Sequence, residues 1–280
     1  MASQMILVLD FGGQYNQLIA RRVRECSVYC EVKPYTTSLE EIKALNPIGI
    51  IFTGGPNSVY DPASPQADPE IFKLGIPILG ICYGCQLLAH NLGGRVVAAT
   101  EDSAREYGKT ETYFNTDCKL FRGLPAESIT WMSHGDYMAK VPEGFALVAH
   151  SDACPNVAIA DEKRGFYGVQ YHPEVNHTEH GTDMIRNFLY EVCGAAGDWT
   201  MGDYKESSIK AIREKVGGGK VLDIVHYVQI GEETVSELHI KIPHLVGGAE
   251  NFFSVHAILN AVYDIFIHAI FLSYQGTSGI

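Results

Sequence analysis

In this 280-residue chain, the residue whose sequence context most clearly indicates a reactive side chain is Cys82. It stands between Gly80 and Gly84 in the run GICYG. The mostly apolar residues before it predict a buried strand, and Tyr83 to Asn91 have the spacing of a helix. In such an elbow the glycines let the chain turn, and the central side chain points out of the sheet at a helix N-terminus, which favours a thiolate. A cysteine can also be an inert buried residue, but two glycines have no purpose in an ordinary strand. We therefore predict that Cys82 is a nucleophile.

A base for this nucleophile is available in the run GVQYHPEV, where His172 and Glu174 are two residues apart. Phe166 to Tyr171 has the pattern of a strand, and we expect Pro173 to keep the chain extended, so that both side chains point to one face. A histidine can deprotonate a cysteine, and a carboxylate can orient the imidazole and stabilise its charge. A histidine at a strand end is usually structural, but the cysteine elbow favours the catalytic interpretation.

Two further histidines, His177 and His180, follow at a spacing of three residues. Such a pair can bind a metal ion, but no cysteine or carboxylate cluster completes a set of ligands. We interpret both histidines as solvated or capping residues and expect no metal site.

A pair of glycines before Pro56 follows a predicted strand from Ile48 to Thr53. Glycines leave a backbone N–H free to point into a pocket, and Pro56 fixes the direction of the chain. Acyl transfer at Cys82 needs about two N–H donors for the developing negative charge, and Gly55 and Tyr83 would supply them. A plain Gly-Pro turn is an equally good interpretation of these residues.

The run WMSHGDYM, from Trp131 to Met138, places a polar Ser-His-Gly-Asp string between large apolar residues. Such a string is turn-prone, and taken by itself it favours a structural turn. The alternative is a substrate-binding loop on a rigid scaffold.

These residues must be positioned by the elements around them, and the chain alternates strand and helix from its start. Strand patterns cover Met5 to Asp10, Val28 to Val32 and Ile48 to Thr53, and one helical face is formed by Tyr15, Leu18, Ile19, Val23 and Cys26. This pattern predicts an α/β fold, with a mostly parallel sheet and helices on both faces. Ligands bind such sheets outside the carboxyl ends of the strands, where Asp10, Thr53 and Cys82 are expected. From Arg95 to His150 we expect short strands and turns.

The composition is that of a globular protein, with 46% hydrophobic residues, a net charge of −12 and a pI near 5.3. The excess of acidic residues argues against nonspecific binding to nucleic acid or to anionic membranes, because a protein needs a basic face for such binding. Small molecules are therefore the favoured partners. The seven cysteines are irregularly spaced, and the start of the chain lacks the pattern of a signal peptide. We expect a cytoplasmic location and no disulfides.

Five stretches, taken in order, carry a specific resemblance: DFGGQYNQLIARRVRE, FTGGPNSVYD, GICYGCQLLAHNLGG, WMSHGD and GVQYHPEV. Together they resemble the class I glutamine amidotransferase domain, in the version found at the N-terminus of GMP synthetase, over about residues 5 to 193. The ordered set is far more specific than any one motif. The resemblance implies a flavodoxin-like α/β fold and an enzyme that hydrolyses glutamine to glutamate and ammonia, which aminates XMP to GMP.

The resemblance also implies a role for each site residue. Cys82 attacks the side-chain amide of glutamine, His172 is the base that then protonates the leaving ammonia, and Glu174 orients His172. Gly55 and Tyr83 offer the N–H groups of an oxyanion hole. The residues implied to hold the glutamine are Gln86, Ser133, Gly135 and Asp136.

The resemblance, which assigns residues 1–193 to the amidotransferase domain, continues for a short distance and then stops. Residues 194–222 resemble the connection toward an ATP-pyrophosphatase domain, with an expected helix from Tyr204 to Val216. Residues 223–280 lack the glycine-rich pyrophosphate loop that should follow, and we interpret them as an atypical tail without an assigned fold. Their apolar stretch from Phe252 to Tyr274 contains Asp264, which argues against a membrane span and favours packing on a core or another subunit.

Glutamine hydrolysis by this chemistry needs no cofactor, and ATP and magnesium are expected only at a synthetase site that the sequence does not show. The expected partners are glutamine and a synthetase (ATP-pyrophosphatase) domain or subunit, and a homodimer stays open. Two other functions fit parts of the pattern: a free-standing cysteine hydrolase of γ-glutamyl compounds and a non-catalytic regulatory module. The presence of Cys82, His172 and Glu174 together argues against the last.

Overall fold

The computed structural model describes residues 4–99 and 106–216. The chain divides into two compact units, Met1–Asp203 and Tyr204–Ile280, which we describe separately. The described part of the second unit belongs to a helix, α5 (Met201–Val216), which begins three residues before the start expected from the sequence. The predicted tail from residue 223 to 280, with its apolar stretch, lies outside the described residues. Within the described ranges, no helix has the length and apolar character needed to cross a bilayer.

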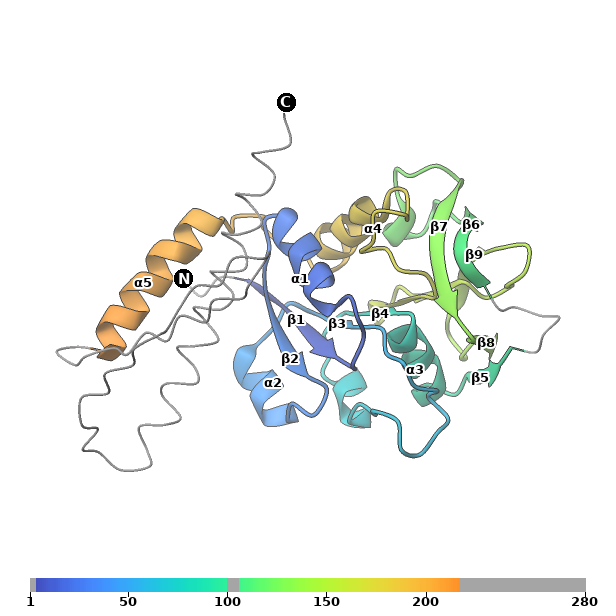
Figure 1. The fold of residues 1–280 in the computed structure, drawn as a ribbon, viewed down its shortest axis with the longest axis horizontal. Helices are drawn as coiled ribbons and strands as arrows, with labels where there is room; N and C mark the ends of the chain where they lie inside the picture. The colour runs from blue at the N-terminus through green and yellow to red at the C-terminus, as the bar shows by residue number, and fades with distance from the viewer. Residues whose placement is uncertain (1–3, 100–105, 217–280) are drawn as a thin grey trace, which may run out of the picture. The chain divides into compact units, whose positions relative to one another are not determined.

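The first unit is built on a nine-stranded sheet (Figure 1). Its strands are β1 (Met5–Asp10), β2 (Tyr29–Pro34), β3 (Gly49–Phe52), β4 (Ile78–Ile81), β6 (Glu106–Phe114), β7 (Glu127–His134), β9 (Ala146–His150), β10 (Ala158–Asp161) and β11 (Phe166–Val169). Their order is β2-β1-β3-β4-β11-β10-β9-β6-β7, parallel from β2 to β11 and antiparallel from there on. Two further strands, β5 (Arg95–Ala98) and β8 (Asp136–Lys140), pair with each other. The predicted α/β fold class is confirmed.

Helices cover both faces of the parallel strands. They are α1 (Asn16–Glu25), α2 (Leu39–Leu45), α3 (Tyr83–Asn91) and α4 (Gly181–Asn187), with short helical turns at Pro69–Lys73, Lys119–Phe121 and Phe188–Val192. Successive residues of β1 point to opposite faces, so Ile6 and Val8 join the core under α1 and α4, whereas Leu7 and Leu9 join the core under α2 and α3. A parallel sheet needs this double cover because its strands are apolar on both sides.

The prediction of a turn or loop from Trp131 to Met138 is wrong. Strand β7 continues to His134 and β8 begins at Asp136, with a single residue between them. The polar residues alternate as a strand requires, with Ser133 exposed and His134 buried. The buried imidazole of His134 lies 3.4 Å from the carboxylate of Glu106 on the paired strand β6. A partner from a distant part of the sequence therefore makes this polar string compatible with a strand.

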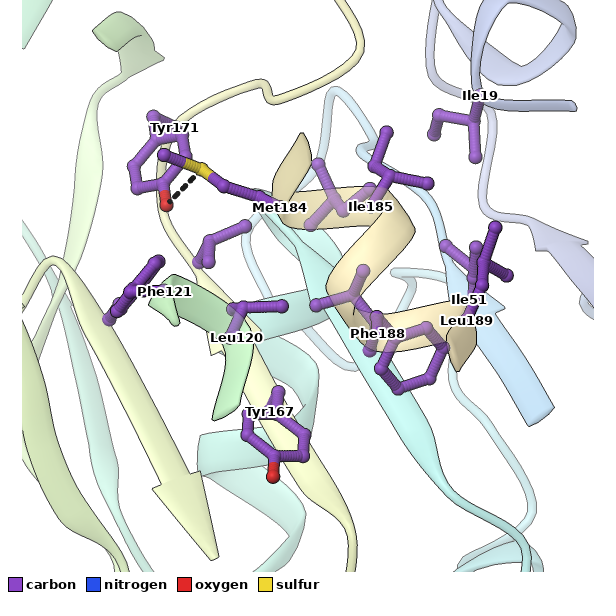
Figure 2. Close-up of a cluster of buried hydrophobic side chains, with 14 of the residues drawn as sticks. Ile19, Ile51, Leu120, Phe121, Tyr167, Tyr171, Met184, Ile185, Phe188 and Leu189 are labelled. Atoms are coloured by element: carbon purple, nitrogen blue, oxygen red, sulfur yellow. Dashed lines mark hydrogen bonds between the residues drawn. The ribbon is translucent and has the colours of Figure 1, made fainter. Parts of the chain in front are cut away.

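A core beneath α4 anchors the chain just before His172. Figure 2 shows this core, with Ile19, Ile51, Leu120, Phe121, Tyr167, Tyr171, Met184, Ile185, Phe188 and Leu189 labelled. The hydroxyl of Tyr171 donates a hydrogen bond to the sulfur of Met184 at 3.1 Å, drawn as a dashed line in Figure 2. Because Tyr171 is fully buried, the backbone that leads into His172 has little freedom to move.

The close approach of β4 to α3 leads to a prediction about stability at Gly80, where alanine would add one methyl group. A Cβ at Gly80 would lie 2.5 Å from the carbonyl oxygen of Gly84 and 2.7 Å from the backbone nitrogen of Cys85. These atoms belong to the first turn of α3 and cannot move aside, so Gly80→Ala should lower the free energy of unfolding by about 1–3 kcal/mol or more. Urea denaturation measures this loss as a lower midpoint with an unchanged m-value.

The control for this experiment is Gly202→Ala in α5. There the nearest atom to an added Cβ is the Thr200 hydroxyl oxygen at 3.7 Å, an ordinary contact distance. Alanine is also the better helix former, so this variant should not lose stability. An equal loss in both variants, or none at Gly80, would contradict the packing described for the elbow.

Candidate active site

Cys82 lies on the turn between β4 and α3 with a φ of +52° and a ψ of −106°. This conformation costs a residue with a side chain about 1–3 kcal/mol, and it persists only where surrounding contacts impose it. Here the Cys82 N–H donates to the Val169 carbonyl at 2.8 Å, and the Gly84 N–H donates to the Thr53 carbonyl at 3.1 Å. A Cβ on Gly84 would overlap the backbone of Phe52. The elbow is thus held by both strands that flank β4.

His172 and Glu174 lie beside this elbow, with 2.8 Å between the imidazole Nδ1 and a carboxylate oxygen. The prediction that Pro173 keeps this segment extended is wrong, because Pro173 and Glu174 form a turn. The Thr178 hydroxyl holds that turn, since it donates to the His172 carbonyl at 2.6 Å and accepts from the Trp131 N–H at 2.9 Å. The two side chains meet through this turn rather than by strand alternation.

The electrostatics of the site centre on the imidazole of His172. Its burial alone would lower its pKa, but hydrogen bonds and charge interactions with Cys82 and Glu174 outweigh burial and raise the pKa to about 10. This higher pKa favours the protonated imidazole, whose positive charge interacts with the sulfur of Cys82 and the carboxylate of Glu174. A cation in this position favours the anionic, nucleophilic form of a cysteine. By contrast, complete burial raises the pKa of the Cys85 thiol and keeps it protonated.

A pocket of about 410 Å³ opens beside these side chains. Its walls are residues 12–16 after β1, residues 54–58 after β3, Cys82 and Gln86, residues 133–136 where β7 ends and β8 begins, and His172 and Glu174, together with Ile19 and Tyr107. Most of these segments follow the carboxyl ends of parallel strands, which is the edge where open α/β sheets bind ligands. The volume lies in the range of sites for small molecules.

The two predicted oxyanion donors lie on adjacent segments of this site. Gly55 lines the pocket, and no hydrogen bond among the described residues occupies its N–H. Tyr83 is the first residue of α3, so its N–H has no acceptor within the helix. A Cβ on Gly55 would lie 2.8 Å from the carbonyl oxygen of Phe11 and 3.2 Å from the Tyr83 ring. Only glycine lets the loop after β3 approach the helix N-terminus this closely, and the Tyr83 side chain itself packs outside the pocket.

The residues implied to hold glutamine, Gln86, Ser133, Gly135 and Asp136, all line the pocket. They differ in what they offer a ligand. The amide nitrogen of Gln86 already donates to the Asp136 carbonyl at 2.9 Å and to the side-chain oxygen of Gln170 at 3.1 Å. The Asp136 carboxylate accepts a hydrogen bond from the Tyr60 hydroxyl at 3.1 Å, and Ser133 is exposed. A ligand can therefore contact the exposed Ser133 and the other oxygen of the Asp136 carboxylate. The amide nitrogen of Gln86 is instead used within the pocket wall.

The sequence does not single out two side chains that contact the predicted catalytic residues Cys82 and His172. The ring of Tyr15 meets the His172 imidazole edge-on, with 5.4 Å between centroids, although its spacing predicts only a helix face. The amide nitrogen of Gln170 lies 3.7 Å from the sulfur of Cys82. For Tyr15 a signal exists, because it follows a glycine pair at the carboxyl end of the first strand. Gln170 has no such local signal.

His177 and His180 lie away from the pocket. The His177 ring packs edge-on against Trp131, with 4.7 Å between centroids. His180 precedes α4 without a capping hydrogen bond from its side chain, and its imidazole lies 3.6 Å from the Asp183 carboxylate. Both side chains are exposed, so the solvated interpretation suits both, and the His177 ring also packs against Trp131. No cluster of three or more potential metal ligands occurs in the part of the chain that the structure describes.

The profile of the class-I glutamine amidotransferase family matches residues 7–192, the segment that carries the whole pocket. The chain belongs to this family. Glutamine-hydrolyzing GMP synthases of Clostridium botulinum and Acetivibrio thermocellus are 56% and 58% identical to it over 222 residues, which is 79% of this chain and 43% of each relative. The chain therefore spans less than half the length of these relatives. The predicted resemblance, and with it the prediction of a glutamine amidotransferase, is confirmed.

Solved structures agree with this amidotransferase assignment. A protein from Thermoplasma acidophilum, described as one subunit of GMP synthase, is 30% identical, with a TM-score of 0.62, and the match covers 75% of this chain and 99% of that one. A glutamine amidotransferase from Thermotoga maritima shares the fold at 19% identity and a TM-score of 0.54, over 70% of this chain and all of that one. The predicted flavodoxin-like amidotransferase fold is confirmed.

The charge of Glu174 leads to a prediction about pH dependence. If His172 protonates the leaving group, hydrolysis is lost as the pH rises through the His172 pKa of about 10. Glu174→Gln keeps the shape of the side chain but removes a charge that raises this pKa. We expect the alkaline limb of kcat/KM for glutamine hydrolysis to move to lower pH in this variant, measured as glutamate formed.

Glu179→Gln is the matched control, because Glu179 is exposed on the same segment and bonds to Ser128 rather than to His172. Its alkaline limb should coincide with that of the unaltered protein. An unmoved limb in Glu174→Gln would show that Glu174 does not tune His172.

Proposed function

We propose that this chain hydrolyses glutamine to glutamate and ammonia at Cys82, and that the ammonia aminates XMP to GMP. The observation that carries the proposal is the strained cysteine elbow beside the imidazole of His172, whose Nδ1 lies 2.8 Å from a buried carboxylate. A nucleophile, an acid-base group and an orienting group in this order are the requirements of acyl transfer. Family membership supplies glutamine as the acyl donor.

In the first half of the reaction the Cys82 thiolate attacks the γ-carbonyl carbon of glutamine. As the carbon–sulfur bond forms, the carbonyl electrons move to oxygen, and the N–H groups of Gly55 and Tyr83 stabilise the resulting oxyanion. When this intermediate collapses, the carbon–nitrogen bond breaks and His172 gives its proton to the departing nitrogen. Ammonia leaves, and a γ-glutamyl thioester remains on Cys82.

In the second half, water attacks the thioester while His172 takes one of its protons. The carbon–sulfur bond breaks, glutamate leaves, and the thiolate and imidazolium are restored. Glu174 keeps the imidazole in one orientation through both halves, and the Asp136 carboxylate has the charge to bind the α-ammonium group of the substrate. No step requires a metal ion or another cofactor.

The use of the ammonia is inferred from the relatives. Those named GMP synthase are more than twice as long as the matched segment, and the Thermoplasma acidophilum protein of nearly the same extent is described as a subunit. We propose that residues 1–193 act as the amidotransferase domain and 194–222 as the connection toward a synthetase domain or subunit. In this scheme the synthetase site, where XMP is activated, holds the ATP and magnesium.

Cys82→Ala tests the nucleophile directly. Alanine fits the glycine-flanked elbow but removes the sulfur, so glutamine hydrolysis should fall by a factor on the order of 10³ or more. Glutamate release measures the activity, and far-ultraviolet circular dichroism checks that the fold is retained. Cys85→Ala makes the same change three residues along α3 in a thiol that faces Gly168 in the core, and it should keep the activity.

Two results would contradict the proposal. Hydrolysis by Cys82→Ala near the rate of the unaltered protein would exclude Cys82 as the nucleophile. Turnover of γ-glutamyl peptides in preference to glutamine would instead favour a free-standing γ-glutamyl hydrolase, since that enzyme would use the same elbow without a partner.

A further inference from the structure

We propose that Gln170 is a positioning residue for the Cys82 sulfur, and that a buried chain of polar groups fixes the direction of its amide. The inference rests on the proposed role of Cys82 as nucleophile. Gln170 lies between the end of β11 and His172, and 1% of its surface is exposed. Its amide nitrogen lies 3.7 Å from the sulfur, within reach of an N–H···S hydrogen bond.

The chain of polar groups starts at a backbone carbonyl in the pocket wall. The carbonyl oxygen of Asp136 lies 2.9 Å from the amide nitrogen of Gln86, and the same nitrogen lies 3.1 Å from the side-chain oxygen of Gln170. The other end of the Gln170 amide faces Cys82. Both glutamines are buried, so water does not compete for these contacts.

The direction of each amide follows from the carbonyl at the start. A backbone carbonyl can only accept hydrogen bonds, so Gln86 must turn its NH₂ group, and not its oxygen, toward Asp136. That NH₂ group also faces the Gln170 side chain, which must therefore present its oxygen. The NH₂ group of Gln170 is then left at the end that faces the sulfur. Reversing either amide would place two donors or two acceptors against each other.

A second donor fixes the carbonyl itself. The Nδ1 atom of His134 lies 3.1 Å from the Asp136 carbonyl oxygen, and for the same reason it must donate. The Glu106 carboxylate lies 3.4 Å from the other imidazole nitrogen and accepts from the Ser151 hydroxyl at 2.7 Å. The Asp136 carbonyl oxygen thus accepts from both His134 and Gln86, which uses both of its lone pairs. A reversed Gln86 amide would turn its oxygen toward this carbonyl, and neither group could then donate.

The sulfur of Cys82 consequently faces the N–H group of Gln170, in addition to the imidazole of His172 whose pKa it raises. It also lies 3.9 Å from the Ser133 carbonyl oxygen, which can accept from a thiol but not from a thiolate. The Gln170 N–H acts in the opposite sense, because it stabilises a sulfur that carries negative charge. Gln170 therefore orients the sulfur and favours its reactive form without touching the substrate.

Gln170→Glu replaces the NH₂ group that faces Cys82 by an oxygen. The other carboxylate oxygen still accepts the hydrogen bond from Gln86. The readout is the rate at which iodoacetamide alkylates Cys82 at neutral pH, with the label located by mass spectrometry. The hydrogen bond from Gln170 stabilises the thiolate, which is the form that iodoacetamide alkylates. Because a hydrogen bond to a charged group is strong, its loss should lower the alkylation rate about tenfold or more. Gln170→Met, which removes the donor without adding charge, should also slow alkylation and serves if the glutamate variant does not fold.

Asn187→Asp is the control for a purely structural effect. The Asn187 amide nitrogen donates to the carbonyls of Leu120 and Arg122, away from the pocket. The same replacement of N–H by oxygen there should lower the melting temperature but leave Cys82 alkylation unchanged. If Gln170→Glu and Gln170→Met are folded and alkylate Cys82 at the rate of the unaltered protein, the proposal is wrong. Because alkylation needs no glutamine, that result would leave the proposed glutaminase function intact, whereas failure to hydrolyse glutamine would not affect this test.

Discussion

The strained backbone at Cys82 is the constraint on which the rest of the site depends. A φ of +52° in a residue with a side chain exists here because β3, β4, β11 and α3 meet at one point. The Cys82 N–H reaches β11, the Gly84 N–H reaches the end of β3, and neither Gly80 nor Gly84 has room for a Cβ. The free energy that this conformation costs is offset by the sheet and helix that hold it. Its result is a sulfur at a helix N-terminus that faces a pocket.

The other proposed catalytic groups are positioned by the last residue of β11 and the three residues that follow it. The carbonyl of Val169 accepts from the Cys82 N–H, the amide of Gln170 faces the sulfur, and Tyr171 is fixed in the core beneath α4. His172 comes next and meets both Cys82 and Glu174. A single short stretch therefore contacts the backbone and the side chain of the proposed nucleophile and carries its proposed base. Mutations that move this stretch should affect all three together.

Local patterns are sufficient to predict the elements that carry the site, since β1 and α3 have the bounds expected from the sequence and Cys82 stands between β4 and α3. What the sequence does not predict depends on contacts between distant segments. The turn after His172 is held by Thr178, whose hydroxyl binds a backbone N–H 47 residues away. Gln170 resembles any residue beyond a buried strand until its contact with Cys82, 88 residues earlier, is known. The polar run from Trp131 to Met138 is predicted as a turn for the same reason, because the residues that pair with it lie on another strand.

We propose that Cys82, and no other thiol of the chain, reacts with the side chain of glutamine. The chain offers an internal comparison, because burial raises the pKa of the Cys26 and Cys85 thiols. The most direct test is to incubate the protein with a glutamine analogue that carries an electrophilic diazoketone in place of the amide, and to locate the adduct by mass spectrometry. We expect one adduct per chain, on Cys82, and protection of Cys82 by excess glutamine. An adduct on Cys85 or Cys26, or an unmodified Cys82 in protein that hydrolyses glutamine, would contradict it.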